Sequence, residues 1–162
     1  MLLVDGYNLL FALKKPDSRT LEGDRAELVK SLESYAERTN QSVRVVFDRG
    51  GPRRERRVRV EVVYVADGST ADDVIVAALE ETADRTAYRV VSSDRAIRKA
   101  AEKRRFEVVE VREFWKDVLS WLAAPTGGEP ASKERGISAG EADAWMKEFG
   151  FGGKDDEARG KR

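Results

Sequence analysis

The chain has 162 residues, 41% hydrophobic and 37% charged, and its 30 basic and 30 acidic side chains give a formal net charge of zero. That length suits one domain with a short appendage, and no segment reaches the roughly 18 consecutive apolar residues of a membrane span. The chain contains neither cysteine nor histidine, which excludes disulfides, thiolate nucleophiles, Cys-ligated zinc and imidazole bases. Any catalysis must therefore use carboxylates, hydroxyls, amines or a hard cation.

Two further absences bear on location. The apolar start of the chain is interrupted at once by Asp5 and has no basic region before it, so it does not resemble a signal peptide. The lack of cysteine also fits a reducing compartment. We therefore expect a cytoplasmic protein with no membrane segment.

The hydrophobic pattern predicts strands that alternate with helices. The predicted strands are residues 1–4, 43–47, 58–65, 88–91 and 106–111. The predicted helices are residues 9–13, 21–39, 70–79, 95–105 and 113–123. This alternation indicates a doubly wound α/β domain with a mainly parallel sheet. The direction of strand 58–65 stays open, because the connection before it is only about a dozen residues long, near the minimum for a parallel crossover.

The composition changes after the last predicted helix. Residues 124–137 are rich in proline, glycine and small polar side chains, which is typical of a linker. Residues 138–150 predict a short amphipathic helix, and residues 151–162 are charged and expected to be disordered. The main domain is therefore expected at 1–123, and the tail helix could dock on it or bind a groove of a partner.

Acidic residues follow several of the predicted strands. Asp5, Asp48 and Asp94 stand at or just after strand ends, and Asp72 opens the helix that follows strand 58–65. The carboxyl ends of parallel strands form the ligand-binding edge of such sheets, so these acids should converge there. The alternative for each acid is an Asx-turn or a helix cap without further function.

Several protein classes with this kind of sheet have sequence motifs that can be looked for in the chain. Neither a dinucleotide-binding glycine motif nor a phosphate-binding P-loop is present. A phosphoaspartyl phosphatase would have an acid where this chain has Tyr7, and a receiver domain a lysine where it has Arg112. A carboxylate cluster that binds a hard divalent cation remains, and such a site can hydrolyse phosphodiesters without histidine or cysteine.

Four short motifs together resemble the YacP-like members of the NYN branch of the PIN-like nucleases. They are Val-Asp-Gly-Tyr-Asn at 4–8, Val-Phe-Asp at 46–48, Thr-Ala-Asp-Asp at 70–73 and Ser-Ser-Asp at 92–94. The resemblance covers residues 1–123. It implies a three-layer Rossmannoid domain with five strands in the order 3-2-1-4-5 and a Mg²⁺- or Mn²⁺-dependent endoribonuclease that cuts mRNA in association with the ribosome.

The resemblance also implies roles for single residues. Asp5, Asp72 and Asp94 match the metal-binding core, and Asn8 matches the residue that orients Asp5 or a metal-bound water. Supporting positions around this core are Asp48, Asp73, Thr70 and Ser93, although helix capping or turn formation also explains these four.

Two basic segments lie beside these acids and are candidates for binding RNA phosphates. The candidate residues are Arg49, Arg53, Arg54, Arg56, Arg57, Arg95, Arg98 and Lys99. A solvated surface is the alternative for each of them.

Two other functions stay open at this point. The chain could be a catalytically silent RNA- or ribosome-binding module, or another Mg²⁺-dependent phosphoryl hydrolase. The sequence leaves undetermined the RNA specificity, the need for the ribosome, the number of ions and the oligomeric state.

Overall fold

The computed structural model describes residues 1–15 and 17–125. The predicted helix at 138–150 and the charged segment at 151–162 lie outside the described residues, as does most of the predicted linker. Within the described ranges, no helix has the length and apolar character needed to cross a membrane.

A six-stranded sheet forms the middle layer of the domain. Its strands are β1 (Leu2–Asp5), β2 (Val43–Phe47), β3 (Arg53–Arg56), β4 (Val60–Tyr64), β5 (Arg89–Val91) and β6 (Glu107–Val109). The order across the sheet is β3-β4-β2-β1-β5-β6, and every neighbouring pair is parallel except β3 with β4. The five predicted strands therefore lie in the expected order, and the strand whose direction was open runs parallel to β2.

The prediction of five strands was wrong by one, because the segment expected to be a basic loop contains β3. This strand runs antiparallel to β4 at the edge of the sheet. Because β3 runs antiparallel to β4, it returns the chain to the end of the sheet where β4 begins. No helix is therefore needed between β2 and β4. Its sequence, Arg-Arg-Glu-Arg, has no apolar residue to mark a strand, and such charges are typical of edge strands because they prevent pairing with other chains.

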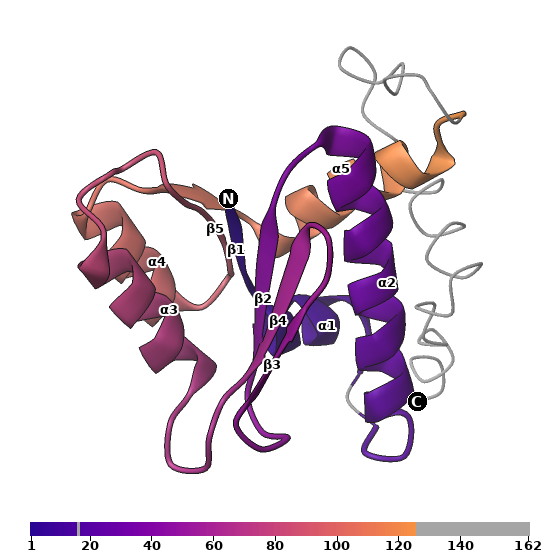
Figure 1. The fold of residues 1–162 in the computed structure, drawn as a ribbon, viewed down its shortest axis with the longest axis horizontal. Coiled ribbons are helices and arrows are strands. Elements are labelled where there is room, and N and C mark those ends of the chain that lie inside the picture. Colours follow the sequence, from indigo (N-terminus) through magenta and orange to yellow (C-terminus); the bar gives the residue numbers. More distant parts are fainter. Residues whose placement is uncertain (16, 126–162) are drawn as a thin grey trace, which may run out of the picture.

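Five helices cover the two faces of the sheet (Figure 1). They are α1 (Gly6–Leu13), α2 (Leu21–Thr39), α3 (Ala71–Glu81), α4 (Arg95–Lys103) and α5 (Val111–Ala123). Helices α1, α2 and α5 pack on one face, while α3 and α4 pack on the other. The predicted three-layer α/β architecture is therefore confirmed, and the five helices occur where the sequence predicted them, with small shifts at their ends.

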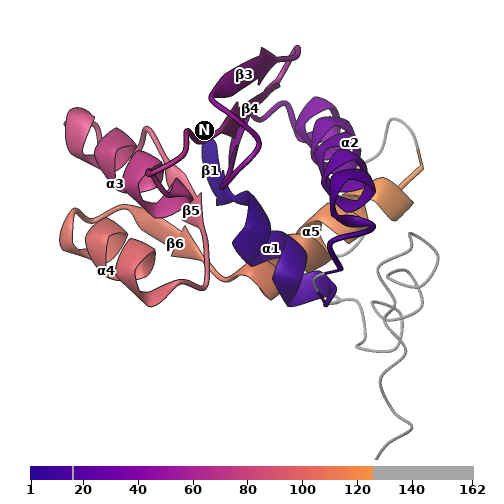
Figure 2. The same cartoon turned by 90° about the horizontal axis from the view of Figure 1, so that it is seen from below.

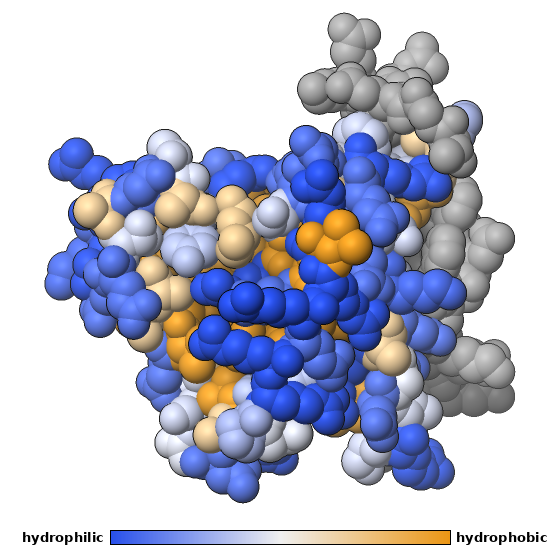
Figure 3. All heavy atoms as spheres, viewed as in Figure 1, coloured by the Kyte–Doolittle hydropathy of each residue, from blue (hydrophilic) through white to orange (hydrophobic). Residues whose placement is uncertain are grey.

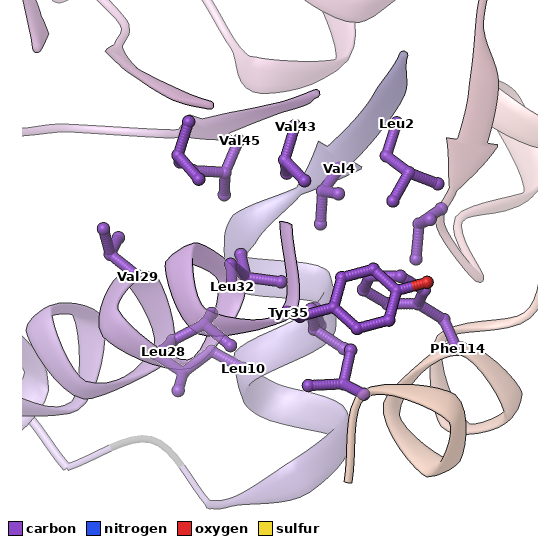
Figure 4. Packing of buried hydrophobic residues seen from close by; sticks show 14 of the residues in the cluster. Leu2, Val4, Leu10, Leu28, Val29, Leu32, Tyr35, Val43, Val45 and Phe114 are labelled. Atoms are coloured by element: carbon purple, nitrogen blue, oxygen red, sulfur yellow. The ribbon is translucent and has the colours of Figure 1, made fainter. Parts of the chain in front are cut away.

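Alternate residues of the strands supply the two cores. Figure 4 shows Leu2, Val4, Val43 and Val45 pointing toward Leu32 and its neighbours on α2. The opposite face of the sheet packs against α3 and α4. This second cluster includes Leu3, Val46, Val63 and Val90 from the strands and Ile75 and Ile97 from the helices. Because the central strands are buried on both faces, their sequences read as nearly continuous apolar runs.

Gly6 lets the turn from β1 into α1 pass directly against the Phe47 ring. A Cβ atom at Gly6 would lie 2.4 Å from this ring, and the ring cannot easily move because Phe47 is fully buried between Tyr7 and Tyr64. The close approach fixes the segment that presents Asp5 and Asn8.

We expect Gly6→Ala to lower the free energy of unfolding by about 1–3 kcal/mol, the usual cost of overpacking. The matched control is Gly23→Ala on α2, where a Cβ would meet nothing within 4 Å and alanine is the better helix former. This control should leave stability unchanged or raise it by up to about 1 kcal/mol. Urea denaturation measures both variants, and a Gly6→Ala protein as stable as the wild type would contradict the packing described.

Candidate active site

The carboxyl ends of the parallel strands bring the predicted acids to one edge of the sheet. Asp5 ends β1, Asp48 follows β2 and Asp94 follows β5, while Asp72 lies in the first turn of α3. Figure 2 shows this edge, with α1, α3 and α4 arranged around the end of β1. Asp5 and Asp94 share a local rule, because each follows a strand and supplies an acceptor for the free N–H groups of the next helix. Asp48 instead accepts from the N–H of Ala71, and the cap of α3 is Thr70 rather than Asp72.

Asp5 is the most buried of these acids, with 6% of its surface exposed. Its Oδ1 accepts a hydrogen bond of 3.0 Å from the backbone N–H of Asn8, so it caps α1 as well as facing the edge. Burial raises the pKa of Asp5 from 3.8 to about 6, and the negative charges of Asp72, Asp48 and Asp94 add to this effect against the Asn8 hydrogen bond. No lysine or arginine of the described segments forms an ion pair with it.

Asp24 shows how the same fold treats a buried carboxylate that has a structural role. Its exposure is also 6%, but Lys14 Nζ donates to Asp24 Oδ1 at 2.7 Å and Thr20 Oγ1 donates to Asp24 Oδ2 at 2.8 Å. Buried charges are normally paired in this way because their desolvation is costly. Asp5 therefore stands out as a buried acid whose charge no described side chain neutralises.

Asp72 and Asp94 lie close enough to Asp5 for their charges to interact with it. Burial raises the pKa of the half-buried Asp72, followed by the charges of Asp94, Asp48 and Asp73. Asp94 accepts hydrogen bonds through Oδ1 from the N–H groups of Ala96 and Ile97 at 2.8 and 3.1 Å, which caps α4. The structure thus brings the three predicted core acids into one electrostatic cluster.

Asp48 connects two of the converging segments. Its Oδ1 accepts a hydrogen bond from the backbone N–H of Ala71, which ties the turn after β2 to the start of α3. Because Ala71 directly precedes Asp72, this contact sets the position of Asp72 relative to β1. Asp48 also contributes negative charge to both Asp5 and Asp72.

Thr70 and Asp73 form a capping box at the start of α3. Asp73 Oδ2 accepts from the Thr70 backbone N–H at 3.0 Å and from its hydroxyl at 2.9 Å, while the Asp73 N–H donates to Thr70 Oγ1 at 3.1 Å. Both side chains therefore serve as the cap of α3. These hydrogen bonds give both residues the capping role that the sequence offered as an alternative.

Asn8 joins the turn after β1 to the turn after β5. Its side-chain oxygen accepts a hydrogen bond of 2.8 Å from the backbone N–H of Ser93, so its side chain holds the segment that carries Asp94, while its backbone N–H holds Asp5. Ser93 in turn donates through its hydroxyl to Glu110 Oε1 at 2.8 Å.

Glu110 is a member of the network that the sequence analysis missed. It caps α5 by accepting from the N–H groups of Arg112 and Glu113 at 2.7 and 3.2 Å, and the Ser93 bond and these backbone bonds lower its pKa against the effect of burial. The signal was present in the sequence, because Glu110 is another acid near the end of a predicted strand, here the strand at 106–111.

The donor set fits a hydrated hard cation. All the candidate ligands are carboxylate or amide oxygens, which suit Mg²⁺ or Mn²⁺ better than softer metals. In the described part of the chain, no three Asp or Glu side chains converge as a closed set of direct ligands. Such a cage is not required, because Mg²⁺ usually keeps several waters and binds one or two carboxylates together with substrate phosphate oxygens.

Some of the candidate RNA-binding residues form ion pairs with nearby acidic side chains, and others do not. Arg57 pairs with Glu33 at 2.8 Å and with Glu55 at 3.5 Å, while Arg54 and Arg56 lie 3.8 and 3.6 Å from Glu61. Figure 3 shows strongly hydrophilic side chains crossing the molecule in front of β2, β3 and β4.

The other candidates are exposed on the turn after β2, on β3 or on α4. Arg53 pairs with Glu55 at 3.0 Å, and Arg98 lies 3.9 Å from Glu102. Arg49 lies in the exposed turn after β2 with a φ of 64°. Arg95 and Lys99 are exposed in the first part of α4, next to the capping Asp94. Arg49 and Arg95 directly follow Asp48 and Asp94 in the sequence, and both are exposed.

Comparison with known proteins agrees with this geometry. The family model of the YacP-like NYN domain matches residues 2–127. The crystal structure of Rae1 (YacP) from Bacillus subtilis is similar at 27% identity and a TM-score of 0.63, covering 75% of each chain. A tryptophan-to-leucine mutant of the same protein gives 29% identity and a TM-score of 0.64, covering 75% of this chain and 76% of that one.

No curated protein matches the chain. The family model nevertheless spans most of the sequence, and the solved structures have a similar fold over three quarters of the chain. The chain therefore belongs to the YacP-like NYN domain family, a group of PIN-like nucleases, and this membership supports a nuclease-like, RNA-related function.

Proposed function

We propose that this protein is a metal-dependent endoribonuclease that cuts mRNA in association with the ribosome, in the cytoplasm. Asp5, Asp72 and Asp94 would hold hydrated Mg²⁺ or Mn²⁺, one or two of them directly and the others through its waters. The observation that carries the proposal is the carboxylate cluster itself, in which a buried Asp5 with a pKa of about 6 faces further acids and no cationic partner from the described residues.

A bound divalent ion would supply positive charge to the phosphate oxygens and lower the pKa of a coordinated water. The chain's own residues keep the carboxylates in place for this. The Asn8 N–H fixes Oδ1 of Asp5, and the described residues donate no hydrogen bond to Oδ2, which leaves that oxygen available. Asp94 is held by the cap of α4, and the Asn8 side chain holds the adjacent turn.

The preference for RNA and for the ribosome rests on family membership and on the basic residues beside the acids. Arg49, Arg95 and Lys99 are exposed next to Asp48 and Asp94, where they can contact phosphates on either side of the scissile bond. A catalytically silent binding module would bind RNA without cutting it. A small-phosphate hydrolase would instead turn over phosphomonoesters.

We expect Asp5→Asn and Asp94→Asn to reduce RNA cleavage by at least about 100-fold, because each removes a negative charge that would hold the metal ion, and the ion's positive charge stabilises the transition state. The assay adds each protein to translating ribosomes with mRNA and Mg²⁺ and maps the cut ends by primer extension. Ribosomes themselves need Mg²⁺, so the metal test uses free RNA, and EDTA should abolish whatever cleavage of free RNA the wild type shows.

The matched control for these variants is Asp84→Asn, which changes the same charge in an exposed loop whose carboxylate only contacts Thr86. It should cut like the wild type. Full cleavage by folded Asp5→Asn would rule out the proposal, and a wild type that hydrolyses phosphomonoesters but leaves mRNA intact would favour the alternative hydrolase.

The raised pKa of Asp5 predicts how stability depends on pH in the absence of metal. A carboxyl with a higher pKa in the folded state stabilises the fold when protonated, so this stability is lost as the pH rises through about 6. At pH 8, Asp5→Asn should be more stable than the wild type by about 1–3 kcal/mol, because asparagine is uncharged and still accepts from the Asn8 N–H. The difference should vanish toward pH 4.

Urea denaturation in EDTA at a series of pH values measures this difference. The Asp84→Asn variant serves again as the control, since its site is exposed and it should gain no stability at pH 8. A wild type that is more stable than Asp5→Asn at pH 8 would show that the Asp5 charge is neutralised in the fold, contrary to the site described.

A further inference from the structure

Four aromatic rings form a row that begins beside the carboxylates. Phe11 stacks on Tyr7 with ring centroids 5.2 Å apart, Tyr7 meets Phe47 edge-on at 5.3 Å, and Phe47 stacks on Tyr64 at 5.8 Å. The row, here called the aromatic row, runs from α1 across β2 to β4. Its Phe11 end is 42% exposed, which makes Phe11 one of the few large apolar side chains on the described surface.

Two arginines from other elements cover the Tyr64 end and the middle of this row. The Arg53 guanidinium of β3 lies 4.0 Å from the Tyr64 ring centroid, and that of Arg25 on α2 lies 5.5 Å from it. Arg25 Nη1 also donates to the Tyr7 hydroxyl at 3.1 Å. Arg25 has no acidic partner among residues 1–15 and 17–125, so its charge is held in place by aromatic groups and left uncompensated.

Gly50 lets the loop after β2 lie close to this arrangement. A Cβ at this position would lie 3.1 Å from the Tyr64 ring and 3.6 Å from Arg25 Nη1, and its φ of +119° is one that residues with a side chain rarely adopt. The loop therefore approaches the arginines without covering them with a side chain.

Two residues of the aromatic row lie close to the acids of the sheet edge in the sequence. Tyr7 lies two residues after Asp5, and Phe47 directly precedes Asp48 while packing against Gly6. A nucleic acid strand with one phosphate at Asp5 would thus have the exposed ring and the two arginines within reach of its neighbouring nucleotides.

We infer that Phe11, Arg25 and Arg53 form a binding subsite for single-stranded RNA next to the bond that is cut. This inference rests on the proposed endoribonuclease function. The Phe11 ring, supported from behind by Tyr7, stacks on one base, and the two guanidinium groups bind backbone phosphates. A stacking platform beside cations is the common solution for single strands, whereas the bases of a duplex are already stacked on each other.

The test measures binding apart from cleavage. The full chain carrying Asp5→Asn is kept in EDTA, and fluorescence anisotropy follows a labelled single-stranded RNA of about ten nucleotides, within the usual site size of such proteins. In this background, Phe11→Ala should weaken binding about 5- to 100-fold, as expected for one lost stacking contact. Phe11→Trp should keep the affinity, and Phe11→Leu should not, because leucine is apolar without a flat π-face.

Arg25→Gln should weaken binding and lower the slope of log affinity against log salt by about 0.7, the value for one phosphate contact on a single strand. The matched control is Arg104→Gln, which removes the same charge from the end of α4, where Arg104 pairs with Glu80 at 2.8 Å. This control should change neither affinity nor slope. Circular dichroism and the urea midpoint show that each variant is folded.

Unchanged affinity in both folded Phe11→Ala and Arg25→Gln would overturn the subsite, as would equal affinity for a duplex of the same sequence or no RNA binding at all. A failure of the proposed function is seen separately. If the wild type does not cut RNA while the binding differences appear, the subsite stands and the endoribonuclease proposal fails. If the wild type cuts and the binding differences are absent, only the subsite fails.

Discussion

The repulsion between carboxylates at one edge of the sheet is the constraint on which the rest of this structure depends. Besides burial, the charges of Asp72 and Asp94 raise the pKa of Asp5, and the charge of Asp94 raises that of Asp72. No arginine or lysine of the described residues pairs with these acids. Such an arrangement costs stability. The two apolar cores on either side of the sheet offset this cost, because they bury the central strands completely and hold their ends in register.

Backbone hydrogen bonds hold the acids where they are. Each acid that ends a strand also satisfies the free N–H groups of a following helix: Asp5 for α1, Asp94 for α4 and, at the outer strand, Glu110 for α5. The Asn8 and Ser93 bonds connect these turns laterally. Capping and a possible catalytic role are therefore compatible in the same side chain, since a cap uses one carboxylate oxygen of Asp5 and leaves the other unbonded by described groups.

Much of this arrangement could be predicted from the sequence, for identifiable reasons. The central strands are buried on both faces and so have apolar runs such as Leu2 to Val4 and Val45 to Phe47. Thr70 with Asp73 shows the spacing of a capping box. Strand β3 could not be predicted in this way, because an edge strand of charged residues pairs through its backbone and has no apolar pattern. Arg25 gave no signal either, since its contact with Tyr7 depends on how α2 crosses α1. The lack of a partner for Asp5 is a property of the folded state, which no local pattern contains.

We propose that the Asp5 carboxylate has no neutralising partner among the described residues and gains one when a divalent cation binds. The most direct measurement is a ¹³C NMR titration of the aspartate carboxyl groups, with Asp5→Asn used to assign the Asp5 resonance, in the absence and presence of Mg²⁺. Without metal, the resonance should titrate with a midpoint of about 6. Saturating Mg²⁺ should move that midpoint well below 6, because a nearby cation favours the charged form. A midpoint near 4 without metal, or one that Mg²⁺ leaves unchanged, would contradict the account.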